Sequence, residues 1–401
     1  MRNLILRPKY LRTIKPFINK DIIKVLTGQR RTGKSYLMYQ IIDYIKKEDK
    51  SCNIIYINKE LHEYDNINNY HELYEYVKSK LKKTRTNYLF IDEIQYITSF
   101  ENALKSLFAE KKYDIYCTGS NANLLSGELA TLLSGRYIEI KVNPLSFNEF
   151  LIFHNLNNNR QSLDLYLKYG GLPYLNNLRL EDEIVFEYLK NIYQAILFKD
   201  VIARFKPRNI DLLERLILFL AKQTGTIFSA RSIVKFLKSQ NINVSVNSLL
   251  DYLKFLSSAF IISKVTRTDI HGKKVFEVGE KYYFTDVGIR NAIAGFSPFD
   301  LNLIIENVVH NHLLYYGYKI HVGQSEQKEI DFIAEKGGEK IYIQVALRVT
   351  DINTANREFG NLLDIKDNYP KYVITLDEYT GASFEGIIHL PLRKFLTEFE
   401  K

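Results

Sequence analysis

The chain has 401 residues, of which 46% are hydrophobic and 25% charged, and 55 Lys and Arg against 46 Asp and Glu give a formal net charge of +9. This composition is close to the globular average, which excludes a disordered or fibrous chain, and the length predicts roughly two to four domains. No run of about 18 apolar residues occurs, so we expect no transmembrane helix and no membrane partner. The charge permits an anionic partner without requiring one.

The N-terminus and the cysteines both indicate a cytoplasmic protein. Residues 1–17 scatter basic side chains among apolar ones and lack the unbroken apolar core of a secretory signal. Cys52 and Cys117 each lie in an apolar, β-rich stretch. We therefore predict buried reduced thiols, which fit a reducing cytoplasm, rather than a disulfide framework or a zinc site.

A phosphate-binding loop is the first functional motif. Residues 21–27 (DIIKVLT) predict a short buried strand, GQRRTGKS follows directly at 28–35, and a helical pattern continues to Lys47. This is G-x-x-x-x-G-K-S in the strand–loop–helix context that it requires. The glycines let successive backbone N–H groups and the helix N-terminus point at phosphate oxygens. We predict that ATP binds to Gly28, Gln29, Arg30, Arg31, Thr32, Gly33, Lys34 and Ser35.

Two side chains of this loop receive specific interpretations. Lys34 would bridge the β- and γ-phosphates, and the Ser35 hydroxyl would ligate Mg²⁺. For Arg30 and Arg31 two interpretations stay open, because each can touch nucleotide or face solvent or a partner.

An acidic pair supplies the second motif. Residues 87–91 (NYLFI) predict a continuous apolar strand that ends in Asp92 and Glu93, 58 residues after Lys34. Carboxylates at this edge of a sheet lie beside a phosphate loop. Asp92 is placed to hold Mg²⁺ through water, and Glu93 is placed to orient or deprotonate the attacking water. Alone the pair would be weak evidence, since acidic helix caps are common.

Five motifs together carry a family resemblance: GQRRTGKS, LFIDEIQ, TGSNANLL, LSGRY and PLSFNEF, in that order. They resemble the AAA-type ATP-binding family, kin to archaeal-type ATPases, that carries a C-terminal domain of unknown function, and the resemblance runs over nearly the whole chain. It implies that Asn121, after a third strand at 113–118, is a polar sensor between the acidic pair and the γ-phosphate. It also implies that Arg136 meets the phosphates, in cis or from a neighbouring subunit of a homo-oligomer. From the residues alone, two alternatives stay open: Asn121 caps a helix starting at Ala122, and Arg136 is a surface arginine.

After residue 143 the β/α alternation stops. Ser146 and Glu149 form the capping box of a new helix, and the helical patterns that follow are interrupted by YGGLP at 169–173, which matches the family's GG-x-P junction. We interpret residues 144–205 as a helical lid over the nucleotide.

Residues 206–295 predict a winged helix. The pattern predicts three helices, at residues 211–222, 229–238 and 245–258. Two strands follow, at residues 261–267 and 274–285, around a loop at 269–273. The third helix of such a domain can enter a DNA major groove. Here it offers only Asn247, Ser248 and Lys254 as polar candidates, whereas the basic groups lie at Arg231, Lys235, Lys238, Arg267, Lys273 and Lys274. Phosphate contacts by these groups would give nonspecific, salt-sensitive DNA binding; packing against the ATPase or a protein partner is the alternative.

Residues 296–401 predict a domain resembling restriction endonucleases. A helix with Glu306 precedes strands joined by a turn at Gly337 and Gly338, and this turn places Asp331 opposite Gln344 and Glu329 opposite Ala346. The pattern resembles the D…[ED]-x-K core of those nucleases, but Gln344 replaces a carboxylate and Ala346 replaces the lysine. Arg348 is the nearest substitute base along the strand. We expect the nuclease-like fold without DNA cleavage, because the lysine that would stabilise charge at the scissile phosphate is absent from this motif.

These observations predict an α/β protein: a P-loop parallel-sheet ATPase core in residues 1–143, a helical lid, a winged helix and a C-terminal nuclease-like α/β domain. The predicted function is an ATPase that uses ATP and Mg²⁺ and couples nucleotide binding or hydrolysis to its C-terminal region, acting on DNA through the winged helix. The alternative is a nucleotide-switched scaffold protein with little turnover.

Overall fold

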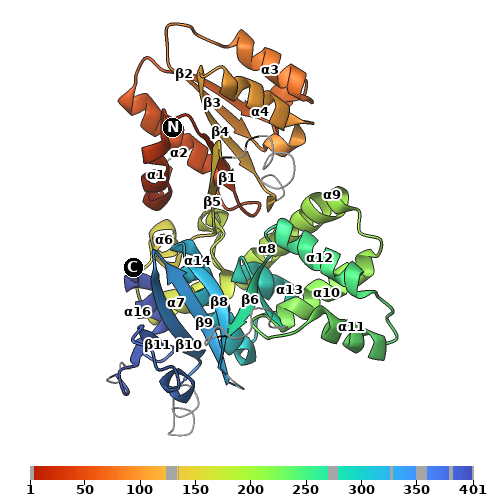
Figure 1. Cartoon of the computed structure of the whole chain (residues 1–401), viewed down its shortest axis with the longest axis vertical. Helices are drawn as coiled ribbons and strands as arrows, with labels where there is room; N and C mark the ends of the chain where they lie inside the picture. The colour runs from red at the N-terminus through yellow and green to blue at the C-terminus, as the bar shows by residue number, and fades with distance from the viewer. Residues whose placement is uncertain are drawn as a thin grey trace. The chain divides into compact units, whose positions relative to one another are not determined.

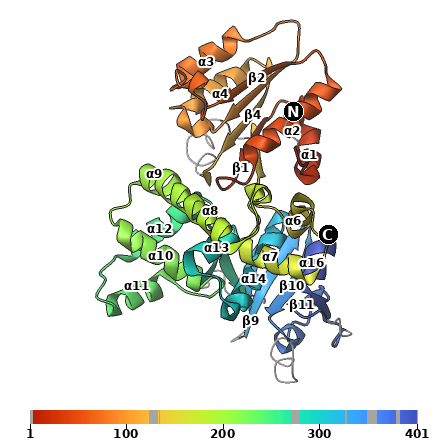
Figure 2. The same cartoon turned by 180° about the vertical axis from the view of Figure 1, so that it is seen from behind.

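The computed structural model describes residues 4–122, 133, 135–269, 279–325, 328–348, 359–378 and 383–399 (Figures 1 and 2). The chain divides into two compact units: unit 1 is Met1–Asn143 with Ser258–Phe260, and unit 2 is Pro144–Ser257 with Ile261–Lys401. Residues 123–125 and Ser134 of the quoted motifs lie outside the described residues, as do residues 270–278 of the predicted hairpin, which include Lys273 and Lys274. No helix in the described ranges is long and apolar enough to cross a membrane.

Unit 1 is a parallel α/β sheet with helices on both faces. Its elements are α1 (Pro8–Ile14), β1 (Ile23–Thr27), α2 (Lys34–Glu48), β2 (Asn53–Asn58), α3 (Tyr70–Ser79), β3 (Asn87–Asp92), η3 (Ile94–Tyr96), α4 (Phe100–Ala109), β4 (Tyr113–Gly119) and β5 (Tyr137–Lys141). The strands lie in the order β2-β3-β4-β1-β5, and every neighbouring pair is parallel. The predicted P-loop sheet is confirmed, with its three predicted strands as β1, β3 and β4; β2 and β5 were not predicted.

The core of unit 1 follows from its apolar strands. Every residue of β1 and β3 is buried, as expected for a parallel sheet covered on both faces. Helices α3 and α4 cover one face and α1 and α2 the other (Figures 1 and 2). Both cysteines are free; Cys117 is buried and Cys52 is partly buried. Because the strands are parallel, the segments after β1, β3 and β4 all emerge at one edge of the sheet.

Unit 2 combines helices with a mixed sheet. Its helices are α6 (Phe147–His154), α7 (Arg160–Tyr169), α8 (Asp182–Ala195), the π-helix η6 (Ile196–Ile202), α9 (Ala203–Phe205), α10 (Ile210–Lys222), α11 (Ala230–Ser239), α12 (Val246–Ser258), α13 (Val287–Ala294), α14 (Leu301–Tyr315) and α16 (Leu392–Glu398). Its strands are β6 (Ile262–Asp269), β7 (Glu280–Phe284), β8 (Lys319–Ser325), β9 (Lys328–Lys336), β10 (Glu339–Ala346), β11 (Lys371–Thr375) and β12 (Ile388–Pro391). They form one sheet in the order β12-β11-β10-β9-β8-β6-β7.

The three predicted helices before the hairpin are confirmed as α10, α11 and α12, followed by the antiparallel strands β6 and β7. The hairpin does not stand apart, because β6 also pairs in parallel with β8, and both strands therefore extend the C-terminal sheet. A division of unit 2 at residues 205 and 295 stays a prediction.

Local signals in unit 2 are also confirmed. Ser146 and Glu149 form the capping box of α6. The β9–β10 register pairs Lys336 with Glu339 and continues to Phe332 with Ile343, as the two-glycine turn predicts. At the predicted junction, a Cβ on Gly170 would lie 2.4 Å from Oδ1 of Asp286, the N-cap of α13. Only glycine fits there.

Candidate nucleotide-binding site

The loop after β1 depends on two glycines. Gly28 has φ 144°, and a Cβ there would lie 2.2 Å from the carbonyl oxygen of Val142, so no other residue fits. Gly33 has φ 92° and caps α2 in the left-handed region. Arg7 ties the loop from outside, because its Nη1 donates to the Thr32 oxygen at 3.1 Å and its Nη2 to the Asn143 oxygen at 3.1 Å. The conformation of the loop is therefore fixed by its two glycines and by the hydrogen bonds from Arg7.

Lys34, the first residue of α2, is 4% exposed and lies inside this loop. Its Nζ donates to the carbonyl oxygens of Gly28 at 3.0 Å and Gln29 at 3.1 Å. The same Nζ lies 3.8 Å from Oε1 of Glu93. The structure thus brings the predicted phosphate-binding lysine and the predicted catalytic carboxylate together.

Asp92 and Ser35 also meet. The Asp92 carboxylate is buried and accepts from Oγ1 of Thr118 at 2.5 Å and from the Tyr56 hydroxyl at 3.1 Å. Burial raises the pKa of Asp92, while hydrogen bonds from Thr118 and Ser35 act in the opposite direction. A hydroxyl and a carboxylate in contact are the oxygen ligands that a P-loop site offers to Mg²⁺.

Glu93 is held in a fixed orientation directly after β3. Its φ of 55° lies in the left-handed region, which a non-glycine residue adopts only where its surroundings impose it. Its backbone N–H donates to Oγ1 of Thr118 at 2.8 Å, and its carboxylate accepts from Nε2 of Gln95. Burial alone would raise the pKa of Glu93, but Lys34, Gln95 and Arg30 bring it below its ordinary value. The carboxylate is therefore ionised at neutral pH.

The donor set fits a triphosphate with Mg²⁺. The Gln29 side chain is 1% exposed, and within the described part of the chain neither its Oε1 nor its Nε2 has a hydrogen-bond partner. A buried amide without partners is costly unless a ligand satisfies it. Beside it lie the Lys34 ammonium for phosphate and the Ser35–Asp92 oxygens for the metal.

Two stretches of the chain match known family models: residues 20–151 match an AAA domain, and residues 160–300 match a domain of unknown function. An uncharacterized protein of Haemophilus influenzae is 38% identical over 391 residues, which is 96% of either chain. An uncharacterized protein of Methanocaldococcus jannaschii is 31% identical over 398 residues, 92% of this chain and 87% of the relative. The chain belongs to their family, with an AAA domain at residues 20–151.

Two solved structures are also similar. A Walker-type ATPase of Pyrococcus abyssi has a TM-score of 0.47 at 16% identity, covering 71% of this chain and 93% of that one. The Orc1 protein of Aeropyrum pernix, solved in complex with DNA, has a TM-score of 0.32 at 12% identity, covering 72% of this chain and 90% of that one.

The remaining predicted residues of the AAA domain differ in their exposure to solvent. Asn121 is buried just after β4, which lies between β1 and β3 in the sheet. Arg30 is 8% exposed, and its guanidinium contacts Tyr96 at 3.1 Å and Glu60 at 3.4 Å. Arg31 is exposed. Arg136 is exposed too, with its guanidinium carbon 5.9 Å from the centroid of the Phe108 ring.

Sequence reasoning missed the residues that hold this site in place. Thr118 bonds to both members of the acidic pair, yet no role was predicted for it although it opens the TGSNANLL motif. Gln95, which orients Glu93, also donates to Ser120 at 3.3 Å. Arg7 had no motif to mark it. One signal existed for Thr118, since it is the last hydroxyl before the carboxyl end of β4, next to the strand of Asp92.

Unit 2 contains a second cluster of charged side chains around Lys281 of β7. The Lys281 Nζ lies 2.7 Å from Glu329, 2.8 Å from Glu306 and 3.1 Å from Asp331. The Tyr283 hydroxyl donates to Glu306 at 2.6 Å. Burial raises the pKa of Glu306 to about 7 against the opposing effect of Lys281.

This cluster confirms the predicted convergence of the acids and corrects the prediction about the base. A lysine does reach the face, but from β7 rather than from the position of Ala346. Arg348 does not supply it, because Arg348 is 65% exposed and pairs with Asp377 at 3.6 Å. Among the described residues, no group of three or more His, Cys, Asp or Glu side chains is arranged to hold a metal ion. The ammonium of Lys281 contacts all three carboxylates and offsets part of their negative charge.

Proposed function

We propose that this protein is an ATPase that binds MgATP at the carboxyl edge of the unit 1 sheet and hydrolyses it to ADP and phosphate. The observation that carries the proposal is the convergence of Lys34, the Ser35–Asp92 pair and Glu93 at the carboxyl ends of β1 and β3, the two parallel strands on either side of β4. The phosphate-loop sequence and the side-chain contacts both support nucleotide binding at this edge, and the chain belongs to a family with an AAA domain.

Each side chain has a distinct part in this proposal. Lys34 contacts the phosphates in place of the two loop carbonyls that it now contacts. Ser35 and Asp92 hold Mg²⁺, which supplies charge neutralisation at the phosphates. Glu93 is ionised and held by Gln95, so it accepts a hydrogen bond from the attacking water and orients it.

Asn121 and Arg136 have less direct support. Asn121 lies buried at the end of the strand between the loop and the acidic pair, which supports a sensor role. Arg136 is exposed, which suits contact with a neighbouring subunit of a homo-oligomer better than contact with its own Lys34.

We further propose that unit 2 uses nucleotide-dependent changes to act on DNA. Helix α11 supports this, because it exposes Arg231, Lys235 and Lys238 while burying Ile233 and Leu237. A basic helix surface of this kind contacts phosphates without reading sequence.

The deciding experiment is the ATPase rate of the full chain with and without single-stranded and double-stranded DNA. We expect Mg²⁺-dependent phosphate release that DNA stimulates and that Glu93→Gln slows at least tenfold. Tight MgATP binding without measurable release would overturn the ATPase proposal in favour of a nucleotide-switched scaffold, and release that no DNA alters would overturn the DNA part.

A further inference from the structure

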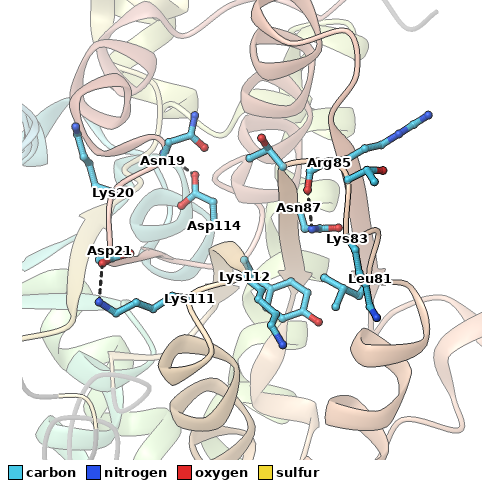
Figure 3. Close-up of a pocket in the computed structure, with 13 residues that line it drawn as sticks. Asn19, Lys20, Asp21, Leu81, Lys83, Arg85, Asn87, Lys111, Lys112 and Asp114 are labelled. Atoms are coloured by element: carbon cyan, nitrogen blue, oxygen red, sulfur yellow. Dashed lines mark hydrogen bonds and ion pairs between the residues drawn. The ribbon is translucent and has the colours of Figure 1, made fainter.

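A basic pocket lies at the opposite edge of the unit 1 sheet from the nucleotide-binding site (Figure 3). It is lined by residues 19–21, 81, 83–87 and 111–114, which precede or begin β1, β3 and β4. Because these strands are parallel, their amino ends open into the pocket and their carboxyl ends carry the phosphate loop and the acidic pair. The pocket has a volume of about 870 Å³. It is a separate site.

The lining is strongly positive. It contains five basic side chains, Lys20, Lys83, Arg85, Lys111 and Lys112, against two acidic ones, Asp21 and Asp114. All five basic residues are exposed. Within the described part of the chain, Lys20, Lys83 and Arg85 form no ion pair, so their charges are available to a ligand.

Both carboxylates of the pocket are already engaged. Asp114 pairs with the buried Lys24 and accepts from the Asn19 N–H at 2.9 Å and from the Tyr116 hydroxyl at 2.8 Å. Asp21 lies 3.5 Å from Lys111. Because each carboxylate already has a cationic partner, its repulsion of a bound anion is weaker than that of an unpaired carboxylate.

The basic groups stand on two sides of the pocket. Figure 3 shows Lys20 and Lys111 on one side and Lys83 and Arg85 on the other. A chain of phosphates lying between them meets Lys20 on one flank and Lys83 and Arg85 on the other, as in the backbone-tracking grooves of proteins that bind single strands. The pocket volume of about 870 Å³ is small beside a DNA duplex, whose major groove alone is about 12 Å wide. A duplex does not fit inside.

We propose that this pocket binds the phosphate backbone of single-stranded nucleic acid. Exposed hydroxyls of Thr84 and Thr86 add hydrogen bonds to phosphate or sugar, and Leu81 and Tyr113 supply the apolar part of the lining. The inference does not depend on ATP hydrolysis, nor on the basic surface of α11.

The test is fluorescence anisotropy of the full chain with a labelled oligothymidine of roughly 16 nucleotides, the upper site size of such grooves. The pocket variant is Lys83→Glu with Arg85→Glu. The matched control is Lys47→Glu with Lys105→Glu, which changes the net charge equally at exposed positions outside the pocket. Circular dichroism checks that each variant is folded, and Lys83→Gln with Arg85→Gln replaces the pocket variant if charge reversal prevents folding.

We expect the pocket variant to weaken binding at least tenfold more than the control does. The slope of log K against log salt should also fall by about 1.4, since each single-strand phosphate contact contributes about 0.7. Equal losses in both variants, or an unchanged slope, would overturn the proposal. So would a duplex that binds as tightly as the single strand and loses as much affinity in the pocket variant. Inorganic polyphosphate that binds this pocket where the oligonucleotide does not would assign it to a different ligand.

Discussion

Nζ of Lys34 lies 3.8 Å from Oε1 of Glu93, and the same ammonium donates to two carbonyl oxygens of its own loop. The charge that should meet a triphosphate and the carboxylate that should orient water thus neutralise each other inside a buried site. A phosphate that recruits Lys34 must compete with Glu93 for it. In the proposed function, nucleotide binding and catalysis are therefore linked through the Lys34–Glu93 pair.

Lys34→Ala should abolish tight MgATP binding and leave the fold intact. The ammonium is the positive charge of this loop that reaches its interior, whereas both glycines that shape the backbone remain. Isothermal titration with MgATP, with circular dichroism as the folding check, measures this. Wild-type affinity in a folded variant would disprove the phosphate-loop assignment.

Glu93→Gln should still bind ATP but hydrolyse it at least tenfold more slowly. Loss of a group that orients or deprotonates water costs about two to four orders of magnitude. The amide keeps the shape of the carboxylate and its contact with Gln95 while losing the charge that faces Lys34. Steady-state phosphate release is the measurement, and an unchanged rate would remove Glu93 from the mechanism.

Thr118→Val should slow turnover more than it weakens nucleotide binding. The hydroxyl donates to Asp92 and accepts from the Glu93 N–H, and leaving such buried groups unpaired costs about 1–3 kcal/mol. Thr118→Ser is the control, because it keeps the hydroxyl and should retain most of the activity. Equal rates for the Val and Ser variants would show that Thr118 only fills space.

The phosphate loop and the acidic pair were predictable because their signals are local. An apolar strand, two glycines at fixed spacing and a following helix specify a loop of known geometry, and a second apolar strand ends in Asp92 and Glu93. The capping box of α6 and the register of β9 with β10 were predictable for the same reason, since each depends on residues a few positions apart.

The site residues that could not be predicted from the sequence depend on contacts between positions far apart in the chain. Arg7 reaches the Asn143 carbonyl across 136 positions, and Lys281 reaches Asp331 across 50. No periodicity or spacing connects such residues, because their meeting depends on how strands are ordered in a sheet. In the strand order, β6 and β8 lie between β7, which carries Lys281, and β9, which carries Glu329 and Asp331, so this contact could not be deduced from the hairpin alone.

Arg136 should act between subunits. A mixture of Arg136→Ala with Lys34→Ala should then recover activity, because one interface can pair the intact Lys34 of one chain with the intact Arg136 of its neighbour. The exposure of Arg136 is compatible with such a contact. ATPase rates across mixing ratios, with the mass measured in MgATP, provide the test. No recovery together with a monomeric mass would place Arg136 in cis or on the surface.

The wild-type protein should show no Mg²⁺- or Mn²⁺-dependent DNA cleavage, although the sequence of residues 296–401 predicts a nuclease-like domain. The reason is the position of Lys281. Its ammonium contacts Glu306, Glu329 and Asp331 at once, and these carboxylates raise its pKa well above the ordinary value against the effect of burial. A divalent ion would have to displace a buried, fully charged ammonium, which is costly because separating such a pair leaves charges uncompensated.

Purified protein is incubated with plasmid and with single-stranded DNA in each metal, alongside Asp331→Ala as the control. We expect intact DNA in both samples. Asp331 accepts from the Val345 N–H at 2.9 Å as well as contacting Lys281, so the control removes one member of the cluster and leaves Glu306 and Glu329 in place. Nicking by the wild type that disappears in the control would show that a metal can enter beside Lys281, and the lysine would then serve to stabilise charge at the scissile phosphate.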